Sequence, residues 1–180
     1  MPELIENYVP QTAIKDQRRQ ALFAWGAIFF ISFLWMFSII VAPIAKANNF
    51  DSLANPIYRF FSYLCHQISW RSYHIGEYPL AVCARCFGFY GGFFVGLLIY
   101  PLVRPLANTD SFPRFWLFLA MIPMGVDWSL TFFGIWENTH LSRLVTGAIL
   151  GAACAFFIVP ALVEINYFLH EKFNRHKRRN

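Results

Sequence analysis

The chain has 180 residues, of which 57% are hydrophobic, 19% aromatic and only 14% charged, and its mean hydropathy is +0.43. The charged fraction is about half that of a typical soluble domain, which disfavours a soluble globule, a disordered chain and a nucleic-acid-binding protein. The formal net charge of +5 is better explained by basic residues at the cytoplasmic ends of membrane spans. The length is that of one domain, and about four spans of roughly 20 to 25 residues would use up most of it.

The first apolar segment, residues 21–45, contains no charged residue and is long enough to cross a bilayer with some tilt. Basic residues precede it and the sequence AKA at 45–47 resembles a cleavage site, so a removable signal peptide is the alternative. The apolar core of a signal peptide is only about 7 to 15 residues long. This difference in length favours a permanent transmembrane helix.

Three further apolar segments follow the first, at residues 79–103, 113–136 and 141–170. We therefore expect an all-α polytopic membrane protein, with a four-helix transmembrane bundle as a single domain over residues 21–170. A cytoplasmic arm (1–20) precedes the bundle, a basic cytoplasmic tail (171–180) follows it, and a loop or helix on the outer face joins the first two spans. Pro79 is expected at the first helical position of the second span, where its missing N–H is tolerated.

Glycines recur every four residues on the second span and again on the fourth. They are Gly88, Gly92 and Gly96 on the second span, and Gly147 and Gly151 on the fourth. Small residues at this spacing let the backbones of membrane helices approach closely. The repeated spacing favours close packing over glycines that a membrane helix merely tolerates.

Lysines and arginines near the span ends predict the orientation. On one side lie Lys15, Arg18, Arg19, Arg104, Arg114, Lys172, Arg175, Lys177, Arg178 and Arg179, and on the other Lys46, Arg59 and Arg71, with Arg85 and Arg143 inside span ends. We expect a multi-pass protein of the cell (inner) membrane, with both termini in the cytoplasm and the loop at 46–78 outside. The lipid bilayer is the expected partner and nucleic acid is not. The basic tail is a candidate for contact with anionic lipid, although a topology signal also explains it.

Cysteine and histidine residues gather at the predicted outer face. Cys65 and His66 lie in the loop before the second span, and Cys83 and Cys86 lie at its start, where their spacing places both thiols on one helix face. Three thiols and one imidazole are the ligand set of a tetrahedral zinc site. We expect these four residues to share one metal ion, zinc or another transition metal. Cys154, among apolar residues of the fourth span, is expected to be a buried free thiol.

Thiol–disulfide exchange is the competing chemistry for the same cysteines. On an oxidising face, Cys83 and Cys86 would form the redox pair with Cys65 as its partner, and the charge of Arg85 would lower a thiol pKa. Membrane thiol oxidases of the DsbB or vitamin-K-epoxide-reductase type also carry a C-x-x-C motif near the outer end of a helix, so architecture does not separate the two hypotheses. His66 favours the metal, because disulfide exchange does not need it.

An acidic and a basic residue also lie within the predicted spans. Asp127 interrupts the third span and Arg143 begins the fourth at a similar depth, and ionised groups in membrane helices usually face a partner. One interpretation is a buried salt bridge that fixes the two spans. The other is catalytic, with Asp127 as a proton acceptor and Arg143 as a clamp for an anionic group such as phosphate. Nearby loop candidates, each more simply explained as solvated or capping, are Arg71, Ser72, His74, Glu77, Asn138 and His140.

The motifs around the cysteines resemble a known family. The signature comprises YLCHQ at 63–67, Arg71-Ser72, CARCFGFYGG at 83–92, Asp127, and Arg143 with Thr146-Gly147. This pattern is similar to the prokaryotic membrane family catalogued as domain of unknown function 2085. Phe87 departs from it, because a small or hydroxyl residue is expected there. The resemblance implies a small multi-span membrane protein and says nothing about a substrate.

Three functional hypotheses remain open. The chain is a metal-dependent membrane enzyme, a thiol–disulfide oxidoreductase, or a non-enzymatic structural metalloprotein that serves as a subunit or scaffold. A channel or transporter is disfavoured, because the spans hold few acidic residues and show no evident inverted repeat. The sequence pattern does not decide whether the protein is an enzyme.

Overall fold

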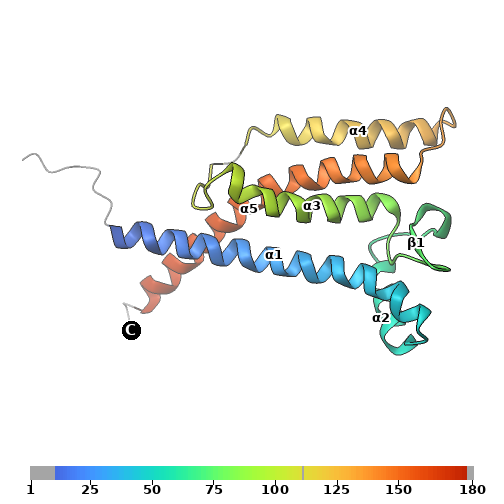
Figure 1. Cartoon of the computed structure of the whole chain (residues 1–180). Helices are drawn as coiled ribbons and strands as arrows, with labels where there is room; N and C mark the ends of the chain where they lie inside the picture. Colours follow the sequence, from blue (N-terminus) through green and yellow to red (C-terminus); the bar gives the residue numbers. More distant parts are fainter. Residues whose placement is uncertain (1–10, 111, 178–180) are drawn as a thin grey trace, which may run out of the picture.

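The computed structural model describes residues 11–110 and 112–177, which form a bundle of long helices (Figure 1). The helices are α1 (Gln11–Ala47), α2 (Asp51–Ser62), α3 (Ala84–Val103), α4 (Phe115–Phe132) and α5 (His140–Lys177), with a 3-10 turn at Ser69–Arg71. A small antiparallel hairpin of β1 (His74–Ile75) and β2 (Tyr78–Pro79) lies between α2 and α3. The predicted all-α membrane bundle is confirmed.

Four of the helices, α1, α3, α4 and α5, are long and apolar enough to cross a membrane. Large apolar side chains such as Phe23, Phe30 and Phe118 are exposed on them, which suits a surface in contact with hydrocarbon. Helix α1 begins well before its predicted apolar segment and α5 ends after its own, because residues that form helices readily lie at both places. Residues 1–10 of the predicted arm and residues 178–180 of the predicted tail lie outside the described residues.

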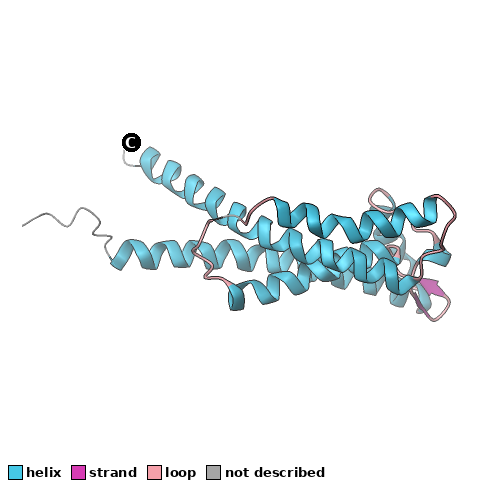
Figure 2. Cartoon of the chain, turned by 90° about the horizontal axis from the view of Figure 1, so that it is seen from above, coloured by secondary structure: helices cyan, strands magenta, loops and turns pink. Residues whose placement is uncertain are grey.

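The bundle is elongated, and the helix termini gather at its two ends (Figures 1 and 2). The start of α1 and the end of α5 lie at one end. The opposite end, here called the hairpin end, holds α2, the hairpin and the first turns of α3 and α5. The predicted loop or helix between the first two spans is therefore a helix followed by a hairpin.

The second span begins later than predicted. Pro79 lies in β2, opposite His74, and α3 begins at Ala84 after the N-cap residue Cys83. The carbonyl of Pro79 accepts a hydrogen bond from the Tyr58 hydroxyl at 2.6 Å. This contact holds the segment extended against α2, so the prediction of Pro79 at the first helical position is wrong.

Helices α3 and α5 pack directly on one another through the predicted glycines. A Cβ atom at Gly92 would overlap the carbonyl oxygen of Ala148, and a Cβ atom at Gly151 would overlap that of Phe89. The same crowding would occur at Gly88, Gly96 and Gly147. The backbones therefore lie too close for any side chain, and the prediction of close packing is confirmed.

Two clusters of buried side chains hold the ends of the bundle together. The cluster near the termini contains Ala21, Leu97, Tyr100, Ala155, Val159 and Val163. The cluster at the hairpin end contains Ile39, Ala42, Phe61, Cys65, Leu80, Ala81 and Val82. Helix α4 packs mainly on α5, and Asp127 is its one buried residue. The core at the hairpin end thus includes Cys65, and the one buried side chain of α4 is the charged Asp127.

Candidate metal centre

The thiols of Cys65, Cys83 and Cys86 converge at the hairpin end. Their sulfur atoms lie within 4.8 Å of one another, and all three cysteines are free. In a tetrahedral zinc site, Zn–S bonds of about 2.3 Å place the sulfur atoms about 3.8 Å apart. The cluster therefore has nearly the dimensions of a metal site, and it joins residues from two separate segments of the chain.

The end of α2 positions Cys65. Its backbone N–H donates a hydrogen bond to the carbonyl of Phe61 at 2.9 Å, which continues the last turn of the helix. Gln67 then has a φ of 48°, in the left-handed region, so the chain reverses immediately after the Cys65-His66 pair. Cys65 is buried in consequence, with 6% of its surface exposed.

The side chain of Gln67 fastens this turn to the segment before α3. Its Nε2 donates to the carbonyl of Tyr58 and to the carbonyl of Ala81, both at 2.8 Å. The backbone N–H of Cys83 in turn donates to the sulfur of Cys65 at 3.3 Å. Gln67 has no predicted role, and its place in the YLCHQ motif is the sole sequence signal for it. Together with the Tyr58–Pro79 hydrogen bond, it ties the two cysteine segments to each other.

The N-terminus of α3 positions the other two thiols. Cys83 is the N-cap residue, and Cys86 lies in the first turn. Interaction with the thiols of Cys65 and Cys86, and then with the backbone N–H groups at the helix start, lowers the pKa of the Cys83 thiol far below its ordinary value. The contribution of Arg85 comes from its backbone N–H, in place of the predicted effect of its charge. The lowered pKa favours the thiolate of Cys83, the form that binds metals.

His66 lies outside the cluster of sulfur atoms. Its side chain is exposed and does not belong to the group within 4.8 Å, although it lines the same cavity. Neighbouring side chains of a non-helical segment point in different directions, so burial of Cys65 leaves His66 at the surface. Cys154 is also apart from the cluster; it is a free thiol as predicted, but half-buried in α5.

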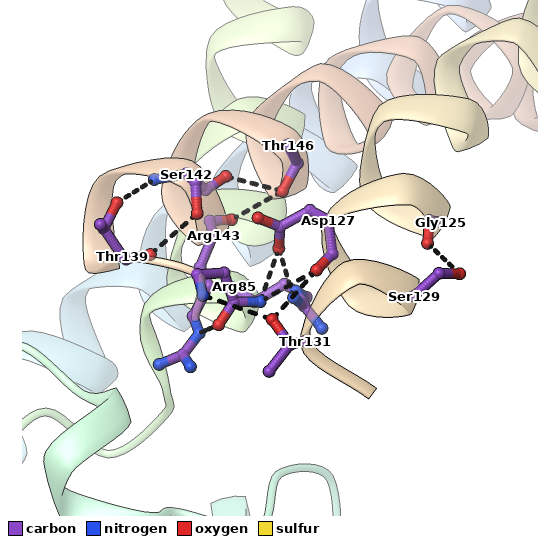
Figure 3. A network of polar contacts seen from close by, with 10 residues as sticks. Arg85, Gly125, Asp127, Ser129, Thr131, Thr139, Ser142, Arg143 and Thr146 are labelled. Carbon is purple, nitrogen blue, oxygen red and sulfur yellow. Dashed lines mark hydrogen bonds and ion pairs between the residues drawn. The ribbon is translucent and has the colours of Figure 1, made fainter. Parts of the chain in front are cut away.

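The partner of Asp127 is Arg85 (Figure 3). The Oδ2 atom of Asp127 lies 2.5 Å from Nη2 of Arg85, in the first turn of α3. Of the two interpretations of Asp127 and Arg143, a direct salt bridge between them does not agree with this geometry. Both arginines lie at the hairpin end, and the packing of α3 against α5 decides which of them the carboxylate meets.

Arg143 reaches the same network through Asn138. Its Nε donates to Oδ1 of Asn138 at 2.6 Å, and Nδ2 of Asn138 donates to Oδ2 of Asp127 at 2.8 Å. Asn138 can bend back over α4 because Gly134, with a φ of +68°, ends that helix in the left-handed region. Asn138 was expected to be solvated or a cap, but it links α4 to α5. Arg85 and Asn138 both donate to Oδ2 of Asp127. This arrangement agrees better with a carboxylate that links helices than with a free proton acceptor.

A cavity of about 550 Å³ joins the thiols to this network. It lies between the loop after α2, the first turns of α3, the second half of α4 and the start of α5. Its polar wall contains Cys65, His66, Arg71, Cys83, Arg85, Cys86, Thr131, Asn138 and Arg143. Its apolar wall contains Leu64, Ile68, Phe89, Tyr90, Met124, Trp128 and Phe132. Such a volume is typical of a site for a small organic ligand.

This fold and this site define the class, a polytopic α-helical membrane protein with a cysteine cluster at one end of the bundle. The chain belongs to the family described as predicted membrane protein (DUF2085), which matches residues 65–157 and so includes the whole thiol cluster. It is 37% identical over 146 residues to uncharacterized protein MJ1492 of Methanocaldococcus jannaschii, in an alignment that covers 78% of this chain and 94% of the relative. No solved structure matches the chain. The predicted family resemblance is confirmed.

Proposed function

We propose that the protein binds one zinc ion through Cys65, Cys83 and Cys86, as the metal centre of a membrane enzyme. The observation that carries the proposal is the convergence of three thiols within 4.8 Å on the wall of a polar cavity. Thiolates are strong zinc ligands, and Cys83 already favours the thiolate form. A second transition metal with an affinity for thiolates would fit the same donors.

The number of converging thiols supports a catalytic zinc site over a purely structural one. Structural zinc sites are closed by four protein ligands, whereas catalytic sites have three and leave a position open. Three thiols meet here, and His66 on the same cavity wall is the candidate that would close the site. When bound, zinc would supply a Lewis acid to a ligand in the cavity. The role of the protein is to hold the metal and to orient that ligand.

We further propose that the metal centre faces the outside of the cell membrane and that both termini are cytoplasmic. Lys15, Arg18 and Arg19 on α1 lie at the end of the bundle opposite the cysteines, as do Arg104 and Arg114 on either side of the connection between α3 and α4. Basic residues concentrate on cytoplasmic loops, which supports this orientation. The basic tail remains a candidate for contact with anionic lipid.

A thiol–disulfide oxidoreductase is the second candidate, and the lowered pKa of Cys83 is the observation that favours it. A reactive thiolate with two further thiols in reach suits disulfide exchange as well as metal binding. The metal accounts for all three thiols at once, since a disulfide joins only two. A non-enzymatic structural metalloprotein would share the zinc and have no use for the cavity.

Metal analysis of the full-length protein, purified in a neutral detergent, tests the proposal. We expect about one equivalent of zinc in the wild type, which Cys83→Ser or Cys86→Ser should abolish. Cys154→Ser is the matched control, since this free thiol lies in α5 outside the cluster, and it should retain the zinc. A metal-free wild type with a disulfide between Cys65 and either Cys83 or Cys86, seen by non-reducing mass spectrometry, would instead establish the oxidoreductase.

A further inference from the structure

The cavity beside the thiols holds more positive charge than its protein partners neutralise. Arg71, Arg85 and Arg143 line it, and Asp127 pairs with Arg85. Within residues 11–110 and 112–177, neither Arg71 nor Arg143 forms an ion pair. The Nε atom of Arg71 is buried and has no hydrogen-bond partner there. Two guanidinium groups thus face one cavity without a carboxylate between them.

The unpaired arginines lie near one another. Arg143 interacts with the like charges of Arg71 and Arg85 and with the opposite charges of Asp127 and Cys83. Three guanidinium groups against one carboxylate and one thiolate leave the cavity net positive, and like charges in a partly buried site repel. Its Nε is bound to Asn138, and its Nη atoms donate no hydrogen bond to any described residue. An anion in the cavity would relieve this repulsion and supply acceptors to both side chains. Guanidinium groups bind phosphate and carboxylate in a bidentate manner.

The remaining wall of the cavity is apolar, and much of it belongs to two candidate membrane spans. Phe89 and Tyr90 of α3 and Met124, Trp128 and Phe132 of α4 all line it, and both helices are candidate membrane spans. Met124 and Phe132 are about 12 Å apart along the helix axis. This length accommodates part of an alkyl or isoprenoid chain, whereas a small hydrophilic anion would leave the apolar wall unused.

We propose that the cavity binds an amphiphile with an anionic phosphate or carboxylate head. The head lies on Arg71 and Arg143, beside the thiol cluster, and the apolar chain lies between α3 and α4. This assignment names the substrate class of the metal centre and in that respect rests on the proposed function. Binding of the amphiphile itself requires the arginines and the apolar wall, and it does not require zinc.

Native mass spectrometry on the full-length protein in dodecyl maltoside tests the assignment with two probes. Dodecyl phosphate supplies the anionic head with a chain, inorganic phosphate supplies the anion alone, and the host detergent supplies a chain with a neutral head. We expect saturable binding of one dodecyl phosphate, at least about tenfold tighter than inorganic phosphate, because the chain buries apolar surface. Absence of saturable dodecyl phosphate binding to the wild type overturns the proposal. Equal affinity for dodecyl phosphate and inorganic phosphate would show that the apolar chain contributes nothing, and it overturns the assignment of an amphiphilic ligand.

Charge-removing variants locate the head of the ligand. Arg143→Gln and Arg71→Gln should each weaken dodecyl phosphate binding about tenfold or more, because each removes a charge-assisted contact. Arg59→Gln is the matched control, since Arg59 is exposed on α2 at the same end and does not line the cavity. Equal weakening by all three variants would show a general effect of surface charge and would overturn the site.

Zinc content measured on the same samples separates the two proposals. Zinc-loaded protein that does not bind dodecyl phosphate refutes the amphiphile site and leaves the metal centre standing. Metal-free protein that binds dodecyl phosphate through Arg71 and Arg143 supports the amphiphile site and refutes the metal centre.

Discussion

Arg85 of α3 forms an ion pair with Asp127 of α4, with 2.5 Å between Nη2 and Oδ2, and the residue after Arg85 is Cys86. One turn of α3 therefore carries both a thiol of the candidate metal centre and the cation that holds α4. Since Asp127 is the one buried residue of α4, this pair is the principal polar tie between α4 and α3. The pair ties α4, which packs mainly on α5, to the first turn of α3 beside the cavity.

Breaking the Arg85–Asp127 pair should destabilise the protein. Asp127→Ala or Arg85→Ala leaves a charge without its partner, and each should lower the free energy of unfolding by about 3 to 5 kcal/mol. The double variant should lose less than the sum of the two single variants. Unfolding in mixed micelles measures these energies, with Arg59→Ala on the exposed face of α2 as the control that changes little. Strictly additive losses would show that the two side chains do not interact.

Zinc removal and the replacement of His66 test how the metal site is closed. Chelation of zinc from the wild type should lower Tm, because metal binding is coupled to folding. If His66 is the fourth ligand, His66→Ala should retain zinc on the three thiols but release it to a chelator faster than the wild type does. Identical release from both proteins would mean that the fourth position is open to the cavity and that His66 is not a ligand.

Loss of the Gln67 amide should weaken the metal site without removing a ligand. Gln67→Ala deletes the hydrogen bonds to the carbonyls of Tyr58 and Ala81, so Cys65 and Cys83 are no longer held together. Zinc affinity should fall about 10- to 100-fold, as for other residues that support a ligand. Competition with a metal indicator measures the affinity. Asn48→Ala, which removes an exposed hydrogen bond to Ile44 at the end of α1, should leave it unchanged.

The glycines at the contact between α3 and α5 should tolerate no side chain. Gly92→Ala and Gly151→Ala each place a Cβ atom on a backbone carbonyl of the facing helix, and each should cost about 1 to 3 kcal/mol through overpacking. Thermal unfolding in detergent measures the loss. Gly125→Ala on α4 is the matched control, since its Cβ meets nothing within 4 Å. A comparable loss at Gly125 would point to helix distortion in place of a steric contact.

The orientation in the membrane is testable by reporter fusions. A reporter after Asn180 should give a cytoplasmic signal, and one inserted near Asn55 on α2 an external signal, because basic residues favour the cytoplasmic side. The reverse result would place the cysteines in a reducing compartment and disfavour disulfide exchange. The metal centre would still stand, since zinc binding does not depend on the side of the membrane.

The four spans and the family followed from the sequence alone. An uncharged apolar segment has one stable conformation in a bilayer, the helix, so length and composition were enough to predict the spans. The convergence of Cys65 with Cys83 and Cys86 was also predicted, since both segments precede or begin the same helix. Close packing at the glycines followed from their spacing, although the spacing did not name the facing helix.

The tertiary structure decided which side chains meet. Asp127 had two arginines at a similar depth, and only the packing of α3, α4 and α5 placed Arg85 on its carboxylate and Arg143 on Asn138. The hairpin that displaced Pro79 from the helix and the turn at Gln67 depend on hydrogen bonds between residues far apart in the chain. A membrane span is fixed by the preference of its own residues for hydrocarbon. A polar contact between spans is fixed by the relative positions of whole helices, which no local pattern encodes.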